Sequence, residues 1–290
     1  MTYGLPYKGS KSKLAARIAE LLPPAHTLVD IFCGGCAVAH AAALSGKFKH
    51  IVINDTEKTP QLFIDAVHGK YQNESRWISR EDFFRLKDSD PYVRFCWSFG
   101  NNGRDYLYSK VIEPYKKALH FAIVYNDFSP LNELDPEAAT RTSNALRNVK
   151  GTTQRRLTLK HLPMLIPNMH PNSQLESLER LESLPYDMFA PSNLDYRSVH
   201  IPENSVIYAD PPYANTDHYG NSVFDSDSFW DWARNSSQPI LISEYHAPDD
   251  FITVARLKRV STLSATNNAA APEHLYTTPR FAHLFSRTLF

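Results

Sequence analysis

The sequence lacks several features that mark large classes of proteins. Its three cysteines are too few, and odd in number, for a disulfide framework, which fits a reducing compartment. No apolar run approaches the roughly 20 residues of a membrane span. The first apolar stretch is interrupted by Lys13, Arg17 and Glu20, which argues against a secretory signal peptide. We therefore expect a cytoplasmic protein with no membrane partner.

Net charge is absent too, because 31 basic and 31 acidic side chains balance. Any affinity for nucleic acid must then come from a local patch. Cys33 and Cys36 form C-x-x-C without a second pair, so we predict no metal site and keep a redox pair as the weaker alternative. The G-x-G-x-x-G fingerprint is missing, which argues against a dinucleotide oxidoreductase.

A short run of β-formers at 205–209 ends in Asp210-Pro211-Pro212-Tyr213. Prolines cannot donate ladder hydrogen bonds, so the strand must stop there. The result is a stiff turn with an acid on one side and an aromatic ring on the other. At the carboxyl end of a parallel strand, such a turn lies where open α/β sheets bind ligands. Alone, the four residues do not exclude a proline-ended strand with a surface tyrosine.

A glycine-containing turn near the amino terminus predicts a cofactor site. The strand 27–32 leads into Cys33-Gly34-Gly35-Cys36 and a small-residue helix, so the backbone can approach a ligand closely. A second strand ends at Asp55, 21 residues after Gly34. An acid at that spacing can accept both hydroxyls of a ribose, although it can also cap the next helix. Together the turn and the acid favour a nucleoside-type cofactor.

The two ends of the chain alternate strands and helices, which predicts a mostly parallel sheet with helices on both faces. We expect further strands at 239–243, 257–263, 274–277 and 282–290. Residues 70–190 lack this rhythm and are predicted to be an inserted, mostly helical domain. Asp195 lies either in a further turn near the cofactor or in an ordinary surface loop.

The insert contains an aromatic segment with two glycines and adjacent asparagines, so at least one turn is expected there. We assign Phe95 and Trp97 to its core. The polar residues of the segment either contact bases or serve the turn itself. These candidate DNA contacts are Asn101, Asn102 and Arg104.

A second segment of the insert, 140–160, carries six basic residues and no acid. Lys and Arg neutralise phosphates, and an Arg can read guanine bidentately. A solvated basic loop is the alternative, but the missing acids favour nucleic acid. The candidate contacts are Arg141, Arg147, Lys150, Arg155 and Arg156.

In their order along the chain, the motifs resemble the Dam-type, alpha-group (D12 class) N6-adenine DNA methyltransferases. The matching features are Tyr7-x-Gly9-x-Lys11, Phe32-x-Gly34, Asp55, an inserted target-recognition domain and Asp210-Pro211-Pro212-Tyr213. The resemblance implies a Rossmann-like α/β S-adenosylmethionine-dependent methyltransferase sheet. Its catalytic parts are 1–69 and 191–290, and the target-recognition and DNA-binding region is 70–190.

The resemblance also implies the reaction and its residues. A methyl group passes from S-adenosyl-L-methionine, leaving S-adenosyl-L-homocysteine, to N6 of a flipped-out adenine in double-stranded DNA. Asp210 touches the cofactor and the amine, Pro211 helps bind the amine, Pro212 stiffens the turn and Tyr213 stacks on the base. The implied cofactor-binding residues are Tyr7, Lys11, Phe32, Gly34, Asp55, Asp195 and Asp210, of which Asp195 rests on its position alone.

One departure from the family pattern stands out: Cys36 occupies the place where the family usually has a second glycine. The alternatives are transfer to cytosine N4 or to adenine in RNA, or a non-catalytic DNA-binding protein with this fold. We expect a monomer in a bacterial, prophage-carrying or phage-infected cell. The bases that flank the target are not predicted.

Overall fold

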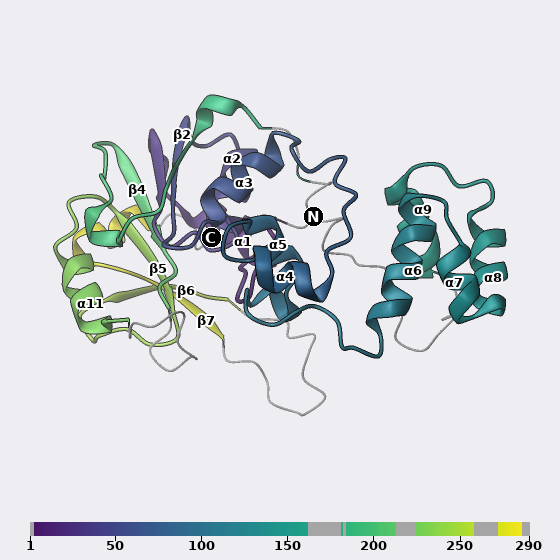
Figure 1. Cartoon of the computed structure of the whole chain (residues 1–290). Coiled ribbons are helices and arrows are strands. Elements are labelled where there is room, and N and C mark those ends of the chain that lie inside the picture. The colour runs from purple at the N-terminus through teal and green to yellow at the C-terminus, as the bar shows by residue number, and fades with distance from the viewer. Residues whose placement is uncertain (1–2, 162–180, 182–183, 213–223, 258–271, 286–290) are drawn as a thin grey trace. The chain divides into compact units, whose positions relative to one another are not determined.

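The computed structural model describes residues 3–161, 181, 184–212, 224–257 and 272–285 (Figure 1). The chain divides into two compact units. The first, called the sheet unit, comprises Met1–Leu5, Gly9–His68 and Ser183–Phe290. The second, called the inserted unit, comprises Pro6–Lys8 and Gly69–Glu182. Tyr7 therefore belongs to the inserted unit and Lys11 to the sheet unit.

The sheet unit is built on seven strands in the order β3-β2-β1-β4-β5-β7-β6. Neighbouring strands pair in parallel except β7, which runs antiparallel to β5 and β6. The predicted mostly parallel sheet is confirmed. The strands are β1 (Thr27–Asp30), β2 (His50–Asn54), β3 (Phe189–Ser192), β4 (Ser205–Ala209), β5 (Ile240–Glu244), β6 (Ile252–Leu257) and β7 (Glu273–Thr277).

Helices pack on both faces of this sheet, so its central strands are buried along nearly their whole length. Every residue of β4 is buried. On one face α11 inserts Phe229, Trp230 and Ala233 into a cluster with side chains of β1, β4 and β5. The helices α1, α2 and α3 lie on the other side (Figure 1). The helices are α1 (Ala15–Leu21), α2 (Ala37–Leu44), α3 (Thr59–Val67), α11 (Ser226–Arg234) and α12 (Ala282–Phe285).

Strand directions bring several chain segments to one edge of the sheet. The carboxyl ends of β1, β2, β4 and β5 meet there because these strands are parallel. The strand β7 runs the other way, and its pairing of Glu244 with His274 brings its first residue, Glu273, to the same edge. Turns and acids that are distant in sequence therefore converge.

Two details of the sheet differ from the sequence-based expectations. The segment Ala282–Phe285 is helical rather than a strand, because Pro279 sits at the start of a 3-10 turn, Pro279–Phe281, and leads the chain into the helix. The strand β6 covers Ile252–Leu257 and so ends at the residue where the expected strand 257–263 was to begin. Residues 258–263 and 286–290 lie outside the described residues. The sheet also contains β3, which the sequence pattern did not reveal.

The inserted unit is helical in the part that the structure describes, as expected. Four helices, α6 to α9, share an apolar core that includes Leu119, Ile123, Leu131, Leu146 and Leu159. Phe95 and Trp97 are buried, which confirms their assignment to the core. The helices are α4 (Arg80–Leu86), α5 (Pro91–Cys96), α6 (Glu113–Val124), α7 (Ser129–Leu134), α8 (Pro136–Leu146) and α9 (Thr152–His161).

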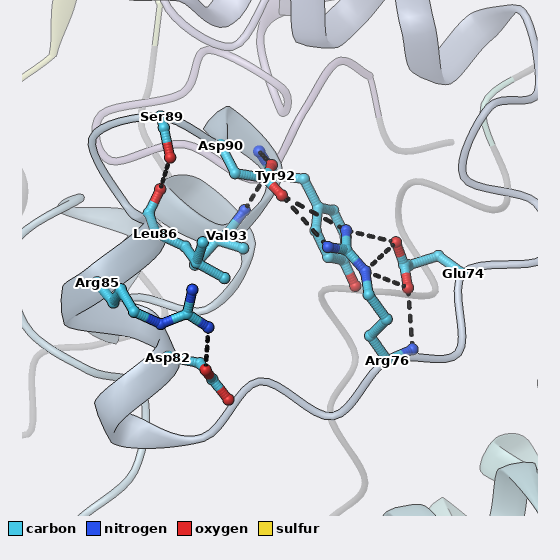
Figure 2. A network of polar contacts seen from close by, with 9 residues as sticks. All are labelled: Glu74, Arg76, Asp82, Arg85, Leu86, Ser89, Asp90, Tyr92 and Val93. Atoms are coloured by element: carbon cyan, nitrogen blue, oxygen red, sulfur yellow. Dashed lines mark hydrogen bonds and ion pairs between the residues drawn. The ribbon is translucent and has the colours of Figure 1, made fainter.

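A polar network orients α5 within the inserted unit (Figure 2). The Asp90 carboxylate accepts from the backbone N–H groups of Tyr92 and Val93 and so caps the helix. The Arg76 guanidinium contacts Asp90 at 3.4 Å, is held bidentately by Glu74 and lies 5.3 Å from the centre of the Tyr92 ring. The Asp90 carboxylate therefore stabilises the start of α5 in two ways, because it accepts from N–H groups of the helix and from the Arg76 guanidinium.

Candidate active site

The centre of the candidate site is an ion pair between Lys11 and Asp210. Asp210 follows the last residue of β4, and the Lys11 ammonium donates to both of its carboxylate oxygens at 2.7 Å. The Lys11 side chain is 5% exposed and that of Asp210 is 19% exposed. Lys11 is thus not a solvated lysine of a helix start but a buried cation that orients the acid of the Asp-Pro-Pro turn.

A second carboxylate contacts the same ammonium. Glu273, the first residue of β7, is fully buried, and its Oε1 lies 3.5 Å from Lys11 Nζ. The Ser243 hydroxyl of β5 donates to that oxygen at 2.7 Å. Sequence inspection missed Glu273, because no local motif surrounds it and only the reversed direction of β7 brings it to this edge.

Further carboxyl groups lie near the pair, and burial raises the pKa of each. Burial, together with the nearby Asp210 and Glu273 carboxylates, raises the pKa of Glu244 to about 7, against the effects of the Tyr245 N–H and of Lys11. Burial also raises the pKa of Asp30 well above its usual range, with a further contribution from Asp210. Asp30 accepts from the backbone N–H of Ala39 in α2 at 3.2 Å.

Asp55 holds the glycine turn that follows β1. Its Oδ2 accepts from the Gly34 N–H at 2.9 Å and its Oδ1 from the Glu57 N–H at 2.9 Å. Burial raises the pKa of Asp55 to about 6. It does not cap α3, whose first turn starts from Lys58 without a side-chain cap. A carboxylate has about four acceptor sites, so both oxygens can accept another hydrogen bond.

A buried asparagine, Asn54, positions the segment that contains Asp55. The sequence did not predict this role of Asn54. Asn54 donates to the carbonyls of Ile31 and Leu194 at 3.0 Å and accepts from the Ser192 hydroxyl at 2.7 Å. It thereby ties β2 to the end of β1 and to the loop after β3. Its position, one residue before an acid at a strand end, is the signal that could have found it.

Cys36 adopts the backbone conformation that a glycine would supply at its place. Its φ of 58° and ψ of 29° are left-handed, and its side chain is fully buried at the start of α2. The turn therefore keeps a glycine-like geometry at a strain of about 1–2 kcal/mol. Cys33 and Cys36 are free thiols with sulfur atoms 3.4 Å apart. Burial raises the pKa of both, which disfavours the thiolate that redox chemistry requires.

The amino-terminal segment packs closely on this turn. Gly4 has a φ of 69°, and a Cβ there would lie 2.3 Å from the Gly35 carbonyl oxygen. The Gly4 N–H donates to His40 Nδ1 at 3.0 Å, and the Leu5 N–H donates to the Gly35 carbonyl at 2.7 Å. The segment before Lys11 is thereby anchored to the same turn that Asp55 holds.

The other predicted cofactor residues have contacts of their own. Phe32 packs its ring 5.3 Å from that of Tyr196, within the cluster beneath α11. Tyr7 lies 5.7 Å from the Phe95 ring in the inserted unit. Asp195 is exposed and accepts two bonds from the Arg197 guanidinium, which lowers its pKa. The cofactor roles of these three residues stay predictions.

In the catalytic turn, Pro211 is buried and Pro212 is half-buried. Tyr213 lies outside the described residues, so its stacking role stays a prediction.

The asparagines of the insert serve the turn in which they lie. Asn101 donates to the Phe95 carbonyl, and Asn102 accepts from the backbone N–H groups of Arg104 and Asp105. Arg104 is exposed. Phe99, in the same turn, is 66% exposed, an unusual state for a large aromatic side chain that the sequence did not reveal. A role in DNA contact stays a prediction for Asn101, Asn102 and Arg104.

The basic segment separates into exposed and buried members. Arg141, Arg147 and Lys150 are exposed on α8 and the turn after it. Arg155 donates to the Ala122 carbonyl and to Asn126, which ties α9 to the end of α6. Arg156 is 4% exposed, so its side chain offers little surface to a phosphate. Of the five candidates, Arg141, Arg147 and Lys150 have the exposed side chains that a phosphate contact requires.

Within the described residues, no cluster of three or more His, Cys, Asp or Glu side chains could hold a metal ion. No helix among them is long and apolar enough to cross a membrane.

The mostly parallel sheet order, with β7 reversed, defines a Rossmann-like methyltransferase fold. Residues 7–238 match the family of D12 class N6 adenine-specific DNA methyltransferases. The chain belongs to this family, which is S-adenosylmethionine-dependent and modifies adenine in DNA. Transfer to cytosine or to RNA is not favoured.

A comparison of structures finds the rRNA methyltransferase aviRa from Streptomyces viridochromogenes. It is 13% identical, with a TM-score of 0.35, over 93% of this chain and 86% of that one. A search of curated protein sequences finds no match.

Proposed function

We propose that the carboxyl edge around Asp210 is the site where the chain methylates adenine N6. The observation that carries this proposal is the bidentate Lys11–Asp210 pair at the end of β4, on the sheet edge that also holds the Asp55 turn. An ammonium aligned on both oxygens presents the carboxylate in one orientation. The Asp210 carboxylate is therefore oriented before the substrate arrives.

Asp210 and the Pro211 carbonyl act together on the target amine. The N6 lone pair of adenine is delocalised into the ring, so the amine is a poor nucleophile. Two acceptors that take the two N–H bonds draw the nitrogen toward a tetrahedral shape and localise its lone pair. Hydrogen bonds to a charged acceptor contribute about 1.5–3 kcal/mol each, and positioning supplies more. Asp210 is also placed to take the proton that the amine loses on methylation.

The residues present fit S-adenosylmethionine, which supplies an electrophilic methyl group when bound. Asp55 has acceptor capacity left on both oxygens, as a ribose requires. The αL conformation of Cys36 and the positive φ of Gly34 open the turn backbone toward a ligand. Phe32 follows β1 next to this turn, where its ring supports the adenosine side. Lys11 orients Asp210 from the methionine side.

We further propose that the inserted unit contacts double-stranded DNA through Arg141, Arg147 and Lys150. These exposed cations suit phosphate contacts, which set orientation but carry little sequence information. Arg104 and Phe99 are exposed in another turn of the same unit and suit contact with bases. The adenine must leave the duplex stack, at a cost of a few kcal/mol. Tyr213, directly after the two prolines, suits stacking on that base.

We expect Asp210→Asn to lose at least about 1000-fold in the rate of methyl transfer while it still binds S-adenosylmethionine. The amide keeps the size of the carboxylate but loses its charge, and it presents a donor where the amine needs an acceptor. Single-turnover transfer of a labelled methyl group to DNA measures the rate, and calorimetry measures cofactor binding. Wild-type rates in this variant would remove Asp210 from the mechanism. Glu20→Asn, at an exposed acid of α1, serves as the control.

A further inference from the structure

The Lys11 ammonium lies between the carboxylates of Asp210 and Glu273, which are at different distances from it. It bonds both oxygens of Asp210 at 2.7 Å and stands 3.5 Å from Glu273 Oε1. The longer distance is within ion-pair range but beyond a good hydrogen bond. A movement of less than about 1 Å would exchange the preferred partner.

Glu273 is built into the fold as a fixed counter-charge. It is fully buried, lies on the strand β7 rather than on a loop, and its Oε1 accepts a hydrogen bond from the Ser243 hydroxyl at 2.7 Å. A buried carboxylate is costly unless it is paired and hydrogen-bonded. Stability alone does not require an acid here, since an apolar side chain would avoid that cost.

The Lys11 contact limits what Asp210 can do for a substrate. While the ammonium donates to both Asp210 oxygens, it neutralises the charge that an amine N–H would otherwise meet. Asp210 can therefore bind the amine strongly only if the Lys11 ammonium donates a hydrogen bond to another acceptor instead.

We infer that Glu273 is a positioning residue for methyl transfer: it draws the Lys11 ammonium from Asp210 when the target amine binds, so that Asp210 accepts the amine at full charge. The inference rests on the proposed role of Asp210. It concerns a step within the protein alone, because Lys11 stays protonated and only its hydrogen bonds change partner.

Two substitutions separate charge from structure at this position. Glu273→Gln keeps the length and the acceptor for Ser243 but loses the charge. Glu273→Asp keeps the charge but shortens the side chain in a packed interior, which costs stability. If Glu273 acts through its charge, the kcat order is wild type, then Asp, then Gln, with Gln reduced at least about ten-fold. The KM for S-adenosylmethionine should change less than three-fold, and thermal unfolding should show Asp to be the less stable variant.

A merely structural role gives the opposite order, because the isosteric Gln would then retain more activity than Asp. That order, or wild-type kcat in Glu273→Gln, overturns the inference. Failure of the proposed function itself is recognised separately, since Asp210→Asn would then remain active.

A measurement on the unaltered protein covers the case in which both variants fail to fold. A crystal structure with S-adenosylhomocysteine and a duplex that the protein methylates should show Lys11 Nζ within about 3 Å of Glu273 Oε1. Its distance to at least one Asp210 oxygen should have lengthened. An ammonium that still bonds both Asp210 oxygens beside a flipped adenine contradicts the exchange.

Discussion

At the residue scale, the site depends on carboxylates held by unlike partners. Asp210 is bound by an ammonium and Asp55 by two backbone N–H groups. The first arrangement orients a charge, while the second leaves a buried acid whose pKa is raised to about 6. The two acids are therefore held in different ways although they lie at one sheet edge.

Cofactor affinity should fall as the pH drops below about 6, because Asp55 is then protonated and its carboxylate no longer accepts both ribose hydroxyls. The loss should approach ten-fold per pH unit for a single proton taken up. The direction of this change follows from the raised pKa of Asp55. Burial disfavours the ionised carboxylate in the free protein, and the ribose hydroxyls stabilise that ionised form when the cofactor binds. Titration of S-adenosylhomocysteine between pH 5 and 8 tests this.

Asp55→Asn supplies the control for that titration. The variant should bind more weakly at pH 8 and lack the loss between pH 6 and 5. A wild-type affinity that stays constant down to pH 5 would refute the assigned role of Asp55.

At the element scale, the turn between β1 and α2 shows how a family geometry survives a changed residue. Cys36 takes a φ of 58° where glycine is usual, and it is enclosed by the amino-terminal segment and the helix start. The packing around the buried Cys36 side chain offsets the backbone strain of this conformation, which is about 1–2 kcal/mol.

We expect Cys36→Val to lower the free energy of unfolding by at least about 2 kcal/mol, since a β-branched residue is disfavoured most at positive φ. Cys36→Gly should cost less, because glycine adopts this φ freely and only a small side chain is removed. Chemical denaturation of both variants measures the difference. Equal stability of the two would mean that the backbone at this turn is not left-handed.

Elements defined by neighbouring residues were predictable from the sequence. The strand before Asp210, the glycine turn and the acid after β2 each depend on a few adjacent residues. The contacts that complete the site join distant segments: Glu273 reaches Lys11 only through the reversed β7. Four residues, Ala282–Phe285, carry too little periodicity to separate helix from strand.

At the scale of the whole molecule, we assign methyl transfer to the sheet unit and DNA contact to the inserted unit. Composition predicted a basic segment there but could not predict which side chains point outward. Arg156 shows why. Neighbouring residues of a helix point in different directions, so packing buries Arg156 of α9 while the adjacent Arg155 is less buried.

Reversing the charge of Arg147 and Lys150 to Glu should weaken DNA binding. The slope of log affinity against log salt should fall by about 1 for each phosphate that the protein no longer neutralises. The matched control is Lys49→Glu, an exposed residue just before β2 in the sheet unit. Fluorescence anisotropy at several salt concentrations gives the slopes. An unchanged slope in the double variant would remove these residues from the DNA interface.

The most direct test of the central claim is the identity of the methylated base. Duplex genomic DNA treated with the protein and methyl-labelled S-adenosylmethionine is digested to nucleosides and analysed by mass spectrometry. We predict label in N6-methyl-deoxyadenosine alone, and none when Asp210→Asn replaces the wild type. Label in N4-methyl-deoxycytidine, or equal N6 label from the variant, would contradict it.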